Sequence, residues 1–279
     1  MRDKDRMKTL RVLMIGDVVG AAGRAIFQKH VDKLKRDHDI NAVIVNGENC
    51  AHGRGITTKN VRFFEHNGVD VITSGNHIWR HKEIYPYLDQ HSNLLRPANF
   101  PAATPGVGAT TFMVEGHRIG VINLQGRVFM KELIDCPFYK ADALINQLRE
   151  KTSIILVDFH AEASSEKMAM GFFLDGRVSA VVGTHTHVQT ADERILPEGT
   201  AFMTDLGMTG SLNSMLGMKK EPIIYNFLTA LPVKFNPETI PPLVMSGALI
   251  EIDIETGKAI KIERIRIVDN ELHAGGEDD

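Results

Sequence analysis

The sequence predicts an α/β layered fold in which a largely parallel sheet core carries antiparallel additions. Short apolar, β-branched strands alternate with helical segments, which is the pattern of parallel sheets covered by helices. Two other segments, residues 110–127 and 246–268, have the paired alternating runs of antiparallel hairpins. The length of 279 residues and the hydrophobic content of 43% suit one large globular domain or two small ones.

Two strand–helix units open the predicted core. Residues 9–20 form an apolar run that stops at Gly16, and residues 23–38 then place apolar side chains at helical spacing. Residues 41–55 give a β-branched strand that ends in a turn rich in Gly and Asn, and residues 58–68 are expected to be helical. This repeated plan predicts parallel strands joined by helices.

Three later segments extend the core: residues 69–79, 153–173 and 178–187. Each contains a buried-type strand that is followed by polar residues at its carboxyl end. The alternating run at residues 110–127 turns at Gly116, and the run at residues 246–268 turns at Gly257. We therefore expect mixed sheets, with an antiparallel hairpin at the C-terminal end of the core.

One domain is expected over residues 10–268, with a flexible N-terminal extension at residues 1–9 and a frayed tail at residues 269–279. Residues 204–246 are rich in Gly, Pro and Met and are expected to form a loop excursion with one helix at residues 221–232. Its methionines suit either a subunit contact or core filling. The first alternative predicts a homo-oligomer, a dimer or tetramer.

Charge and cysteine content limit the function classes. The net charge is −3 without a sustained basic run, which argues against a protein that coats duplex nucleic acid, while a single-stranded or small nucleotide substrate stays open. A charged N-terminus and the lack of about 18 consecutive apolar residues predict neither a signal peptide nor a membrane span. Two cysteines give no disulfide framework, so a cytoplasmic protein is expected.

Polar residues recur where the predicted strands end. Five strand ends carry them: Asp17, Glu48 with Asn49, Asn76 with His77, His160, and His185 with His187. In open α/β sheets the carboxyl ends of the strands line the binding crevice, so separate elements can deliver these side chains to one edge. Each also has an ordinary explanation, as a helix cap (Asp17), a turn former (Asn49) or a core histidine (His160). Their recurrence at five ends favours a common site.

This set of side chains fits a metal centre. Carboxylate and imidazole ligands suit iron, manganese or zinc, whereas magnesium prefers oxygen ligands and water. Seven candidate ligands are too many for one tetrahedral ion, but they suit two metals that share a bridging carboxylate. Such ions lie about 3.5–4 Å apart, clamp a phosphoryl group and lower the pKa of bound water to about 7. In this hypothesis His185 and His187 each bind one ion.

The order of these blocks resembles the calcineurin-type metallophosphoesterases. The blocks read GDVVG, NGENCA, SGNHIW, VDFHAEA and GTHTH, with Val19 where that superfamily has a histidine and Glu48 in place of its bridging aspartate. Together with RPANFP, INLQGR and GMTG, they are similar to the YmdB-like branch of bacterial metallophosphoesterases over residues 10–268. The resemblance implies a four-layer αββα sandwich, two metal ions (iron first, manganese second) and hydrolysis of phosphodiesters, with 2′,3′-cyclic nucleotides such as 2′,3′-cAMP favoured.

The resemblance also implies a role for each site residue. One ion would be held by Asp17, Glu48, Asn49 and His187, and the other by Glu48, Asn76, His160 and His185, with Glu48 bridging. Asn49 would fill the gap left by Val19. Metal-bound hydroxide would attack the phosphorus in line, and His77 would protonate the leaving alkoxide or stabilise the phosphoryl oxygens.

Other functions are compatible with the same residues. A phosphomonoesterase or a single-strand nuclease would use the same site, and RNA ends are a further candidate substrate. A regulatory protein could hold the metal for structure alone, with marginal catalysis. Glu162 is expected to steady His160 from outside the ligand set, and His52 and His81 match no ligand position, so they are expected to be solvated or hydrogen-bonded.

Overall fold

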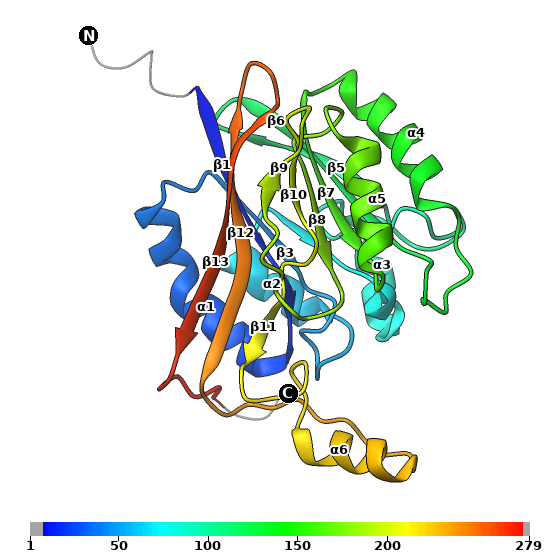
Figure 1. The fold of residues 1–279 in the computed structure, drawn as a ribbon, viewed down its shortest axis with the longest axis vertical. Coiled ribbons are helices and arrows are strands. Elements are labelled where there is room, and N and C mark those ends of the chain that lie inside the picture. Colours follow the sequence, from blue (N-terminus) through cyan, green and yellow to red (C-terminus); the bar gives the residue numbers. More distant parts are fainter. Residues whose placement is uncertain (1–7, 276–279) are drawn as a thin grey trace.

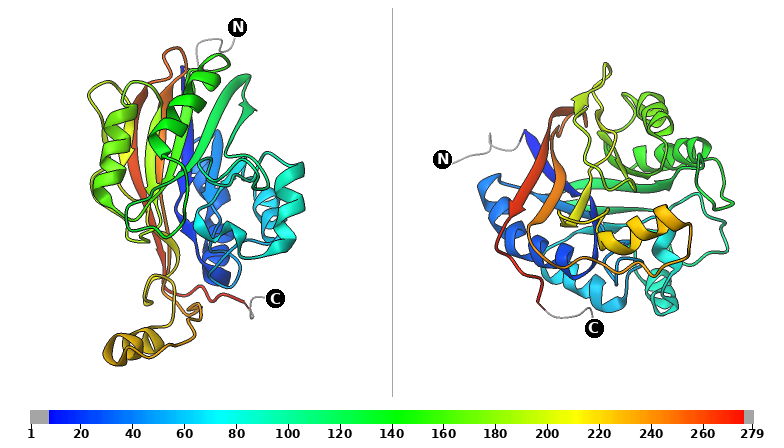
Figure 2. Two further views of the ribbon diagram at one scale, coloured as in Figure 1. Left: turned by 90° about the vertical axis from the view of Figure 1, so that its right-hand side faces the viewer. Right: turned by 60° about the horizontal axis from the view of Figure 1, so that its bottom comes forward.

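Two mixed β-sheets lie face to face, and helices cover the outer face of each (Figures 1 and 2). The computed structural model describes residues 8–275, so most of the extension expected at residues 1–9 and the last four residues of the expected tail lie outside it. The expected αββα sandwich is confirmed. The division into one domain at residues 10–268 stays a prediction.

The first sheet contains β1 (Thr9–Ile15), β2 (Asp17–Val18), β3 (Ala42–Asn46), β4 (Val71–Thr73), β11 (Met208–Ser211), β12 (Leu243–Asp253) and β13 (Ala259–Asp269). Its strand order is β2–β11–β12–β1–β3–β4, and β13 pairs with β12. The second sheet contains β5 (Ala109–Val114), β6 (His117–Gln125), β7 (Ile154–His160), β8 (Ala180–Thr184), β9 (Arg194–Ile195) and β10 (Ala201–Met203). Its order is β5–β6–β7–β8–β10–β9.

The α-helices are α1 (Gly20–Asp37), α2 (Thr58–His66), α3 (Tyr85–Gln90), α4 (Pro137–Arg149), α5 (Ser164–Leu174) and α6 (Lys220–Thr229). Two 3₁₀ turns, η1 (Asn76–Trp79) and η2 (Lys82–Ile84), follow β4. Among residues 8–275, no helix combines the length and the apolar character that crossing a bilayer requires.

Successive side chains along a strand point to opposite faces of the sheet, and this alternation determines which residues pack in each layer. In β1, Val12 and Met14 belong to the core between the two sheets, whereas Leu13 and Ile15 pack with α1 and α2 on the outer face. The outer face of the second sheet packs against α4 and α5, which contribute Ile145 and other apolar residues. Burial of both faces explains the near-continuous apolar runs of these strands.

Parallel pairing sets the position of the strand ends. β1 pairs in parallel with β3 and β3 with β4, while β6, β7 and β8 run parallel to one another in the second sheet. The carboxyl ends of these strands therefore lie at one edge of the sandwich. The expected hairpins are confirmed as β5–β6 and β12–β13.

Several elements were not expected from the sequence, among them α3, α4, β9, β10 and β11. α4 occupies a segment for which no helix was predicted, and β11 lies inside residues 204–246, which were expected to be loops with one helix. The sequence of β11, Met-Thr-Gly-Ser, has no apolar alternation, and its conformation depends on pairing with β2 and β12. It packs closely under α1, since a Cβ on Gly23 would lie 2.3 Å from the carbonyl oxygen of Thr209.

Candidate metal centre

The structure brings all eight predicted site residues together at the carboxyl edge of the two sheets. The first sheet supplies Asp17 at the start of β2, Glu48 and Asn49 in the turn after β3, and Asn76 and His77 in η1. The second sheet supplies His160 at the end of β7 and His185 and His187 in the loop after β8. The site therefore lies between the sheets. All its acidic and amide groups, with His77, come from the first sheet, and the other three imidazoles come from the second.

Glu48, His160 and His185 form the centre of this group. One ligand atom from each lies within 4.8 Å of the other two, so these residues could hold a metal ion. The Nε2 atom of His160 lies 3.3 Å from Glu48 Oε1, 3.0 Å from His185 Nδ1 and 3.2 Å from Asn76 Oδ1. The oxygen and nitrogen donors match the mixed ligand set of iron, manganese or zinc.

Asp17 supplies an independent indication of a cation site. Its Oδ2 accepts a hydrogen bond of 3.1 Å from the backbone N–H of His185. Its Oδ1 is buried and has no hydrogen-bond partner among the described residues. That oxygen lies 3.8 Å from His187 Nε2 and 3.9 Å from His160 Nδ1. Because an unsatisfied buried carboxylate oxygen is costly, a bound metal ion fits this position.

Asn49 links the two halves of the group. Its Nδ2 lies 3.2 Å from Glu48 Oε1 and 3.1 Å from His187 Nε2, and its Oδ1 lies 2.7 Å from His77 Nδ1. The two ends of a carboxamide have nearly the same shape, so a half-turn exchanges them. As a metal ligand Asn49 would need its oxygen on the side of Glu48 and His187.

Gly75 leaves the space that the cluster occupies. A Cβ at this position would lie 2.2 Å from His160 Nε2 and 2.5 Å from Glu48 Oε2. The backbone of Gly75 is extended, with φ −151°, so the need for glycine comes from close approach rather than from conformation. Any side chain here would displace the two residues at the centre of the group.

Electrostatics at the centre favour a positive charge. Burial by itself lowers the pKa of His160, but the carboxylates of Glu48 and Asp17 raise it to about 9. Burial opposes ionisation of Glu48, yet His160 and His77 hold its pKa well below the ordinary value. Burial and the neighbouring His160 lower the pKa of His185 to about 3, which leaves that imidazole neutral and free to coordinate.

A buried hydrogen-bond chain fixes the ring of His160. Asp158 accepts hydrogen bonds from Asn46, from Thr73 and, at 2.8 Å, from the hydroxyl of Thr184. Because Thr184 uses its proton on Asp158, its oxygen accepts from His160 Nδ1–H at 2.9 Å. With Nδ1 fixed in this way, the ring presents Nε2 to Glu48. Burial raises the pKa of Asp158 to about 6.

The loop after β8 holds two histidines in a strained backbone conformation. His185 and His187 have φ values of 99° and 63°, which non-glycine residues rarely adopt. Asp205 anchors the loop by accepting hydrogen bonds from the backbone and hydroxyl of Thr186, at 3.1 and 2.7 Å. Lys167 on α5 pairs with the same carboxylate at 2.6 Å, and both side chains are buried.

Glu162 pairs with His185, not with His160, the residue it was expected to steady. Its Oε2 lies 3.1 Å from His185 Nε2, rather than beside His160. It also lines the shallow hollow above the centre, which has a volume of about 270 Å³. His77, Thr186, His187 and Leu216 line the same hollow, so the cluster is open to a small molecule on this side.

The αββα sandwich, with this donor set between its sheets, defines a phosphoesterase of the metallophosphoesterase fold. Comparison with known proteins gives the family: the YmdB-like protein family matches residues 13–265, and the chain belongs to it. The 2′,3′-cyclic-nucleotide 2′-phosphodiesterase of Bacillus subtilis (strain 168) is 52% identical over 263 residues, which cover 94% of this chain and 99% of that protein.

Two crystal structures are similar to the chain in both fold and sequence. One is described as a novel phosphatase of Mycoplasma pneumoniae and is 36% identical, with a TM-score of 0.89 and 95% of each chain covered. The other, a protein of Thermus thermophilus, is 38% identical, with a TM-score of 0.86, and covers 93% of this chain and 100% of its own. The resemblance found in the sequence is thus confirmed.

Proposed function

We propose that the protein is a binuclear-metal phosphodiesterase that hydrolyses small phosphodiesters, in particular 2′,3′-cyclic nucleotides such as 2′,3′-cAMP. The convergence of Glu48, His160 and His185 beneath an open hollow carries this proposal. The substrate class is supported by the Bacillus subtilis relative, whose name states it and which matches nearly end to end. RNA ends are a further candidate substrate.

Two metal ions would be held by the residues that gather at this edge of the sheets. The first would take Asp17, Glu48, Asn49 and His187, and the second Glu48, Asn76, His160 and His185. The donor set suits iron, manganese or zinc, and the resemblance to the YmdB-like branch implies iron first and manganese second. Such ions supply Lewis-acid polarisation of the phosphoryl oxygens and a nucleophilic water at neutral pH. The partnerless oxygen of Asp17 and the position of Glu48 between His160 and His77 support this assignment.

His77 would act on the substrate. Its Nδ1 lies 2.7 Å from the carboxamide of Asn49 and 3.2 Å from Glu48 Oε1, while its backbone N–H donates to Glu48 Oε2 at 3.0 Å. When Asn49 turns its oxygen toward Glu48 and His187 to bind metal, its Nδ2–H donates to His77 Nδ1, and the proton of the imidazole is then on Nε2. No described residue binds its Nε2, and the ring lines the hollow. Nε2 is therefore the atom available to give a proton to the leaving alkoxide.

Replacing His77 with alanine is expected to lower kcat for 2′,3′-cAMP by about 10²–10⁴-fold, the usual contribution of a general acid. Metal content per chain, measured by mass spectrometry, should stay at the wild-type value. The matched control is His66→Ala, which removes an exposed histidine at the end of α2. Turnover of p-nitrophenyl phosphate and of its bis-ester should be measured in parallel.

Each of these assays can contradict the proposal. Faster turnover of the monoester than of the bis-ester would make the protein a phosphomonoesterase. Two bound ions without turnover of any ester would favour a regulatory protein in which the metal is structural. An unchanged kcat in His77→Ala would remove this histidine from the reaction.

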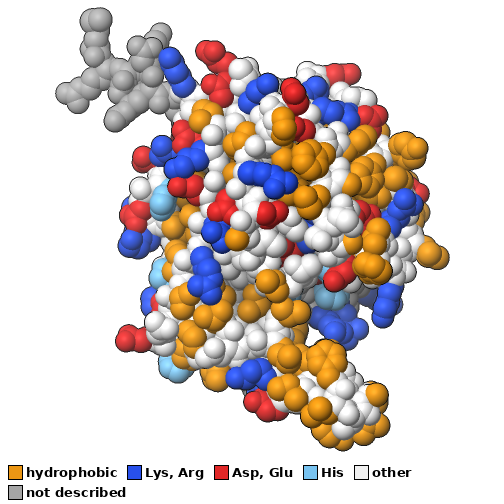
Figure 3. Space-filling model, viewed as in Figure 1, with side chains coloured by type: hydrophobic (Ala, Val, Ile, Leu, Met, Phe, Trp, Pro, Cys, Tyr) orange, Lys and Arg blue, Asp and Glu red, His pale blue; other side chains and the backbone are white. Residues whose placement is uncertain are grey.

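The protein is also expected to act in the cytoplasm as a homo-oligomer. Neither Cys50 nor Cys136 forms a disulfide bond, as is usual in a reducing compartment. α6 extends away from the sandwich (Figures 1 and 2), and apolar side chains cover the face of it seen in Figure 3. Phe227 and Leu228 on this helix are 77% and 80% exposed, which is typical of a surface that a second subunit covers.

The assembly can be tested by changing α6. We expect the wild type to sediment as a dimer or tetramer and Leu228→Glu to sediment as a smaller species, because a buried charge opposes association. Leu133→Glu is the matched control, since Leu133 is 96% exposed but lies outside α6. A monomeric wild type, or equal masses for both variants, would refute the role of α6. The measurement is analytical ultracentrifugation.

A further inference from the structure

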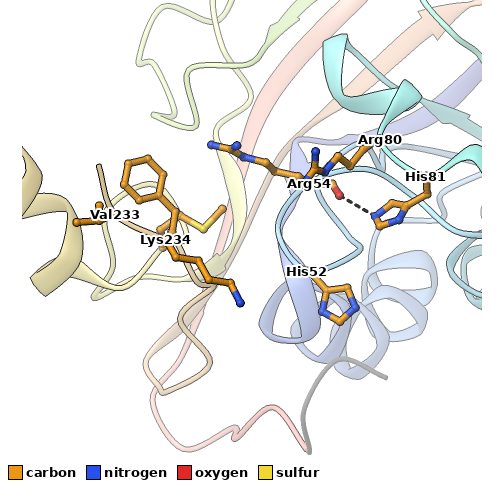
Figure 4. Close-up of a pocket in the computed structure, with 8 residues that line it drawn as sticks. His52, Arg54, Arg80, His81, Val233 and Lys234 are labelled. Carbon is orange, nitrogen blue, oxygen red and sulfur yellow. Dashed lines mark hydrogen bonds between the residues drawn. The ribbon is translucent and has the colours of Figure 1, made fainter. Parts of the chain in front are cut away.

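A second, larger hollow lies beside the metal centre and is lined mainly by basic side chains. It has a volume of about 480 Å³ and is lined by Arg54, Arg80, Lys234 and the imidazoles of His52 and His81. In Figure 4, Arg80 and His81 lie on one side of the hollow and Lys234 on the other, on the segment that follows α6, while the side chain of Arg54 reaches across between them. We refer to this hollow as the basic pocket.

No carboxylate neutralises the two arginines or the lysine among the described residues. The lining contains no Asp or Glu, and none of the ion pairs found in residues 8–275 includes Arg54, Arg80 or Lys234. The whole chain has a net charge of −3, so this concentration of positive charge is local. Clefts lined by one sign of charge attract ligands of the opposite sign.

The basic pocket is also held in place by its own contacts. The His81 Nε2 atom bonds to the carbonyl oxygen of Arg54 at 3.1 Å, and the guanidinium of Arg54 lies 5.9 Å from the centre of the Phe235 ring. A Cβ on Gly55 would lie 2.6 Å from the ring of His81. The loop that carries Arg54 is therefore packed tightly against the loop after η1.

The same three chain segments line both hollows. The turn after β3 gives Glu48 and Asn49 to the metal centre and Arg54 to the basic pocket. The segment after β11 gives Leu216 to the first hollow and Met218 to the second. The two hollows are consequently neighbours, joined by short stretches of chain.

The third segment, η1, connects the two hollows most directly. It carries His77, which lines the hollow above the metal centre. Arg80, the residue that ends this turn, lines the basic pocket. The N–H of Arg80 donates to the carbonyl oxygen of His77 at 3.0 Å. Side chains three residues apart in a 3₁₀ turn lie on the same side, about 6 Å apart along the axis. A ligand that meets His77 can thus extend toward Arg80.

We propose that the basic pocket binds a second phosphate of the substrate, so that the enzyme prefers a short nucleotide chain ending in a 2′,3′-cyclic phosphate to the cyclic mononucleotide. Arginine suits this task because its guanidinium can bind a phosphate through two hydrogen bonds. The inference rests on the proposed function, since it requires that the scissile phosphodiester lies at the metal centre. The substrate class proposed for the metal centre is therefore a short nucleotide chain that ends in a 2′,3′-cyclic phosphate.

The test compares two substrates in three proteins. The substrates are 2′,3′-cAMP and a diadenylate whose 3′ end carries a 2′,3′-cyclic phosphate, and the proteins are wild type, Arg54→Ala/Arg80→Ala and Lys82→Ala. Lys82 is the matched control, because it is an exposed cation close to Arg80 in the chain that does not line the pocket. The readout is the ratio of the two kcat/KM values, with products separated by liquid chromatography.

For wild type and Lys82→Ala, we expect kcat/KM for the diadenylate to exceed that for 2′,3′-cAMP by about tenfold or more, since hydrogen bonds between charged groups contribute at least that factor. The ratio should fall to about one in the double variant. Melting temperature and metal content identify a double variant that fails to fold. Arg54→Lys/Arg80→Lys, which keeps the charge, is the second variant, and its ratio should lie between one and the wild-type value.

The outcomes separate the two proposals. If no protein opens either cyclic phosphate, the proposed function fails. If wild type hydrolyses both substrates with a ratio near one, the proposed function stands and the second phosphate site is refuted. If inorganic phosphate alters 2′,3′-cAMP turnover only when both arginines are present, while that ratio stays near one, the pocket binds a free anion and the substrate role is refuted.

Discussion

Glu48→Gln is expected to lower kcat for 2′,3′-cAMP by at least about 10³-fold and to remove bound metal. The substitution keeps the size of a side chain that is 1% exposed but removes its negative charge. Glu48 is the group that His160, His77 and Asn49 all approach, and it would bridge the two ions. Charge stabilisation of several kcal/mol by bound metal accounts for a loss of this size.

The measurement pairs metal content by mass spectrometry with steady-state kinetics. Glu255→Gln, at an exposed position in the β12–β13 turn, removes the same charge elsewhere and should leave both quantities unchanged. Full metal content and full activity in Glu48→Gln would rule out a bridging carboxylate at this position. Loss of metal in both variants would point to a general effect of charge.

Lys167→Met is expected to lower the free energy of unfolding by about 3–5 kcal/mol, the usual result of removing one partner from a buried ion pair. Lys167 is 1% exposed and Asp205 is fully buried, so the substitution leaves a carboxylate in the interior without its cation. Asp205 also holds Thr186, between the two strained histidines. We therefore expect weaker metal binding in this variant as well.

Urea denaturation followed by circular dichroism measures the effect. Lys33→Met is the matched control, because Lys33 pairs with Asp37 on the exposed surface of α1. Exposed pairs of this kind contribute at most about 1 kcal/mol, so the control should unfold nearly as the wild type does. If Lys167→Met and Lys33→Met lower the free energy of unfolding by the same amount, the buried pair contributes no more to stability than the exposed pair does.

The general arrangement of the site could be predicted because it depends on strand direction. Side chains that follow parallel strands meet at one edge, so Asp17, Glu48, Asn76 and His160 could be placed together from sequence alone. The left-handed backbone of the histidine loop could not be predicted, because His185 and His187 are neither glycine nor in a glycine-rich turn.

The supporting residues were missed because their partners are distant in the chain. Asp158 is a lone acidic residue inside an apolar strand, and such a residue is a usable signal of a buried polar role. Lys167 gives no such signal, since a lysine beside a glutamate on a helix is typical of an exposed face. Arg54 and Arg80 lie in loops, where basic residues are normally solvated, and only the fold places them in one pocket.

The position of β1 determines the order in which the first sheet can form during synthesis. β1 lies between β3 and β12, and about 230 residues separate Ile15 from its partner Gly247. At a translation rate of about 5–20 residues per second, one edge of β1 stays unpaired for roughly ten seconds or more. An open strand edge invites pairing with other chains, so we expect ribosome-bound intermediates that end before β12 to depend on chaperones.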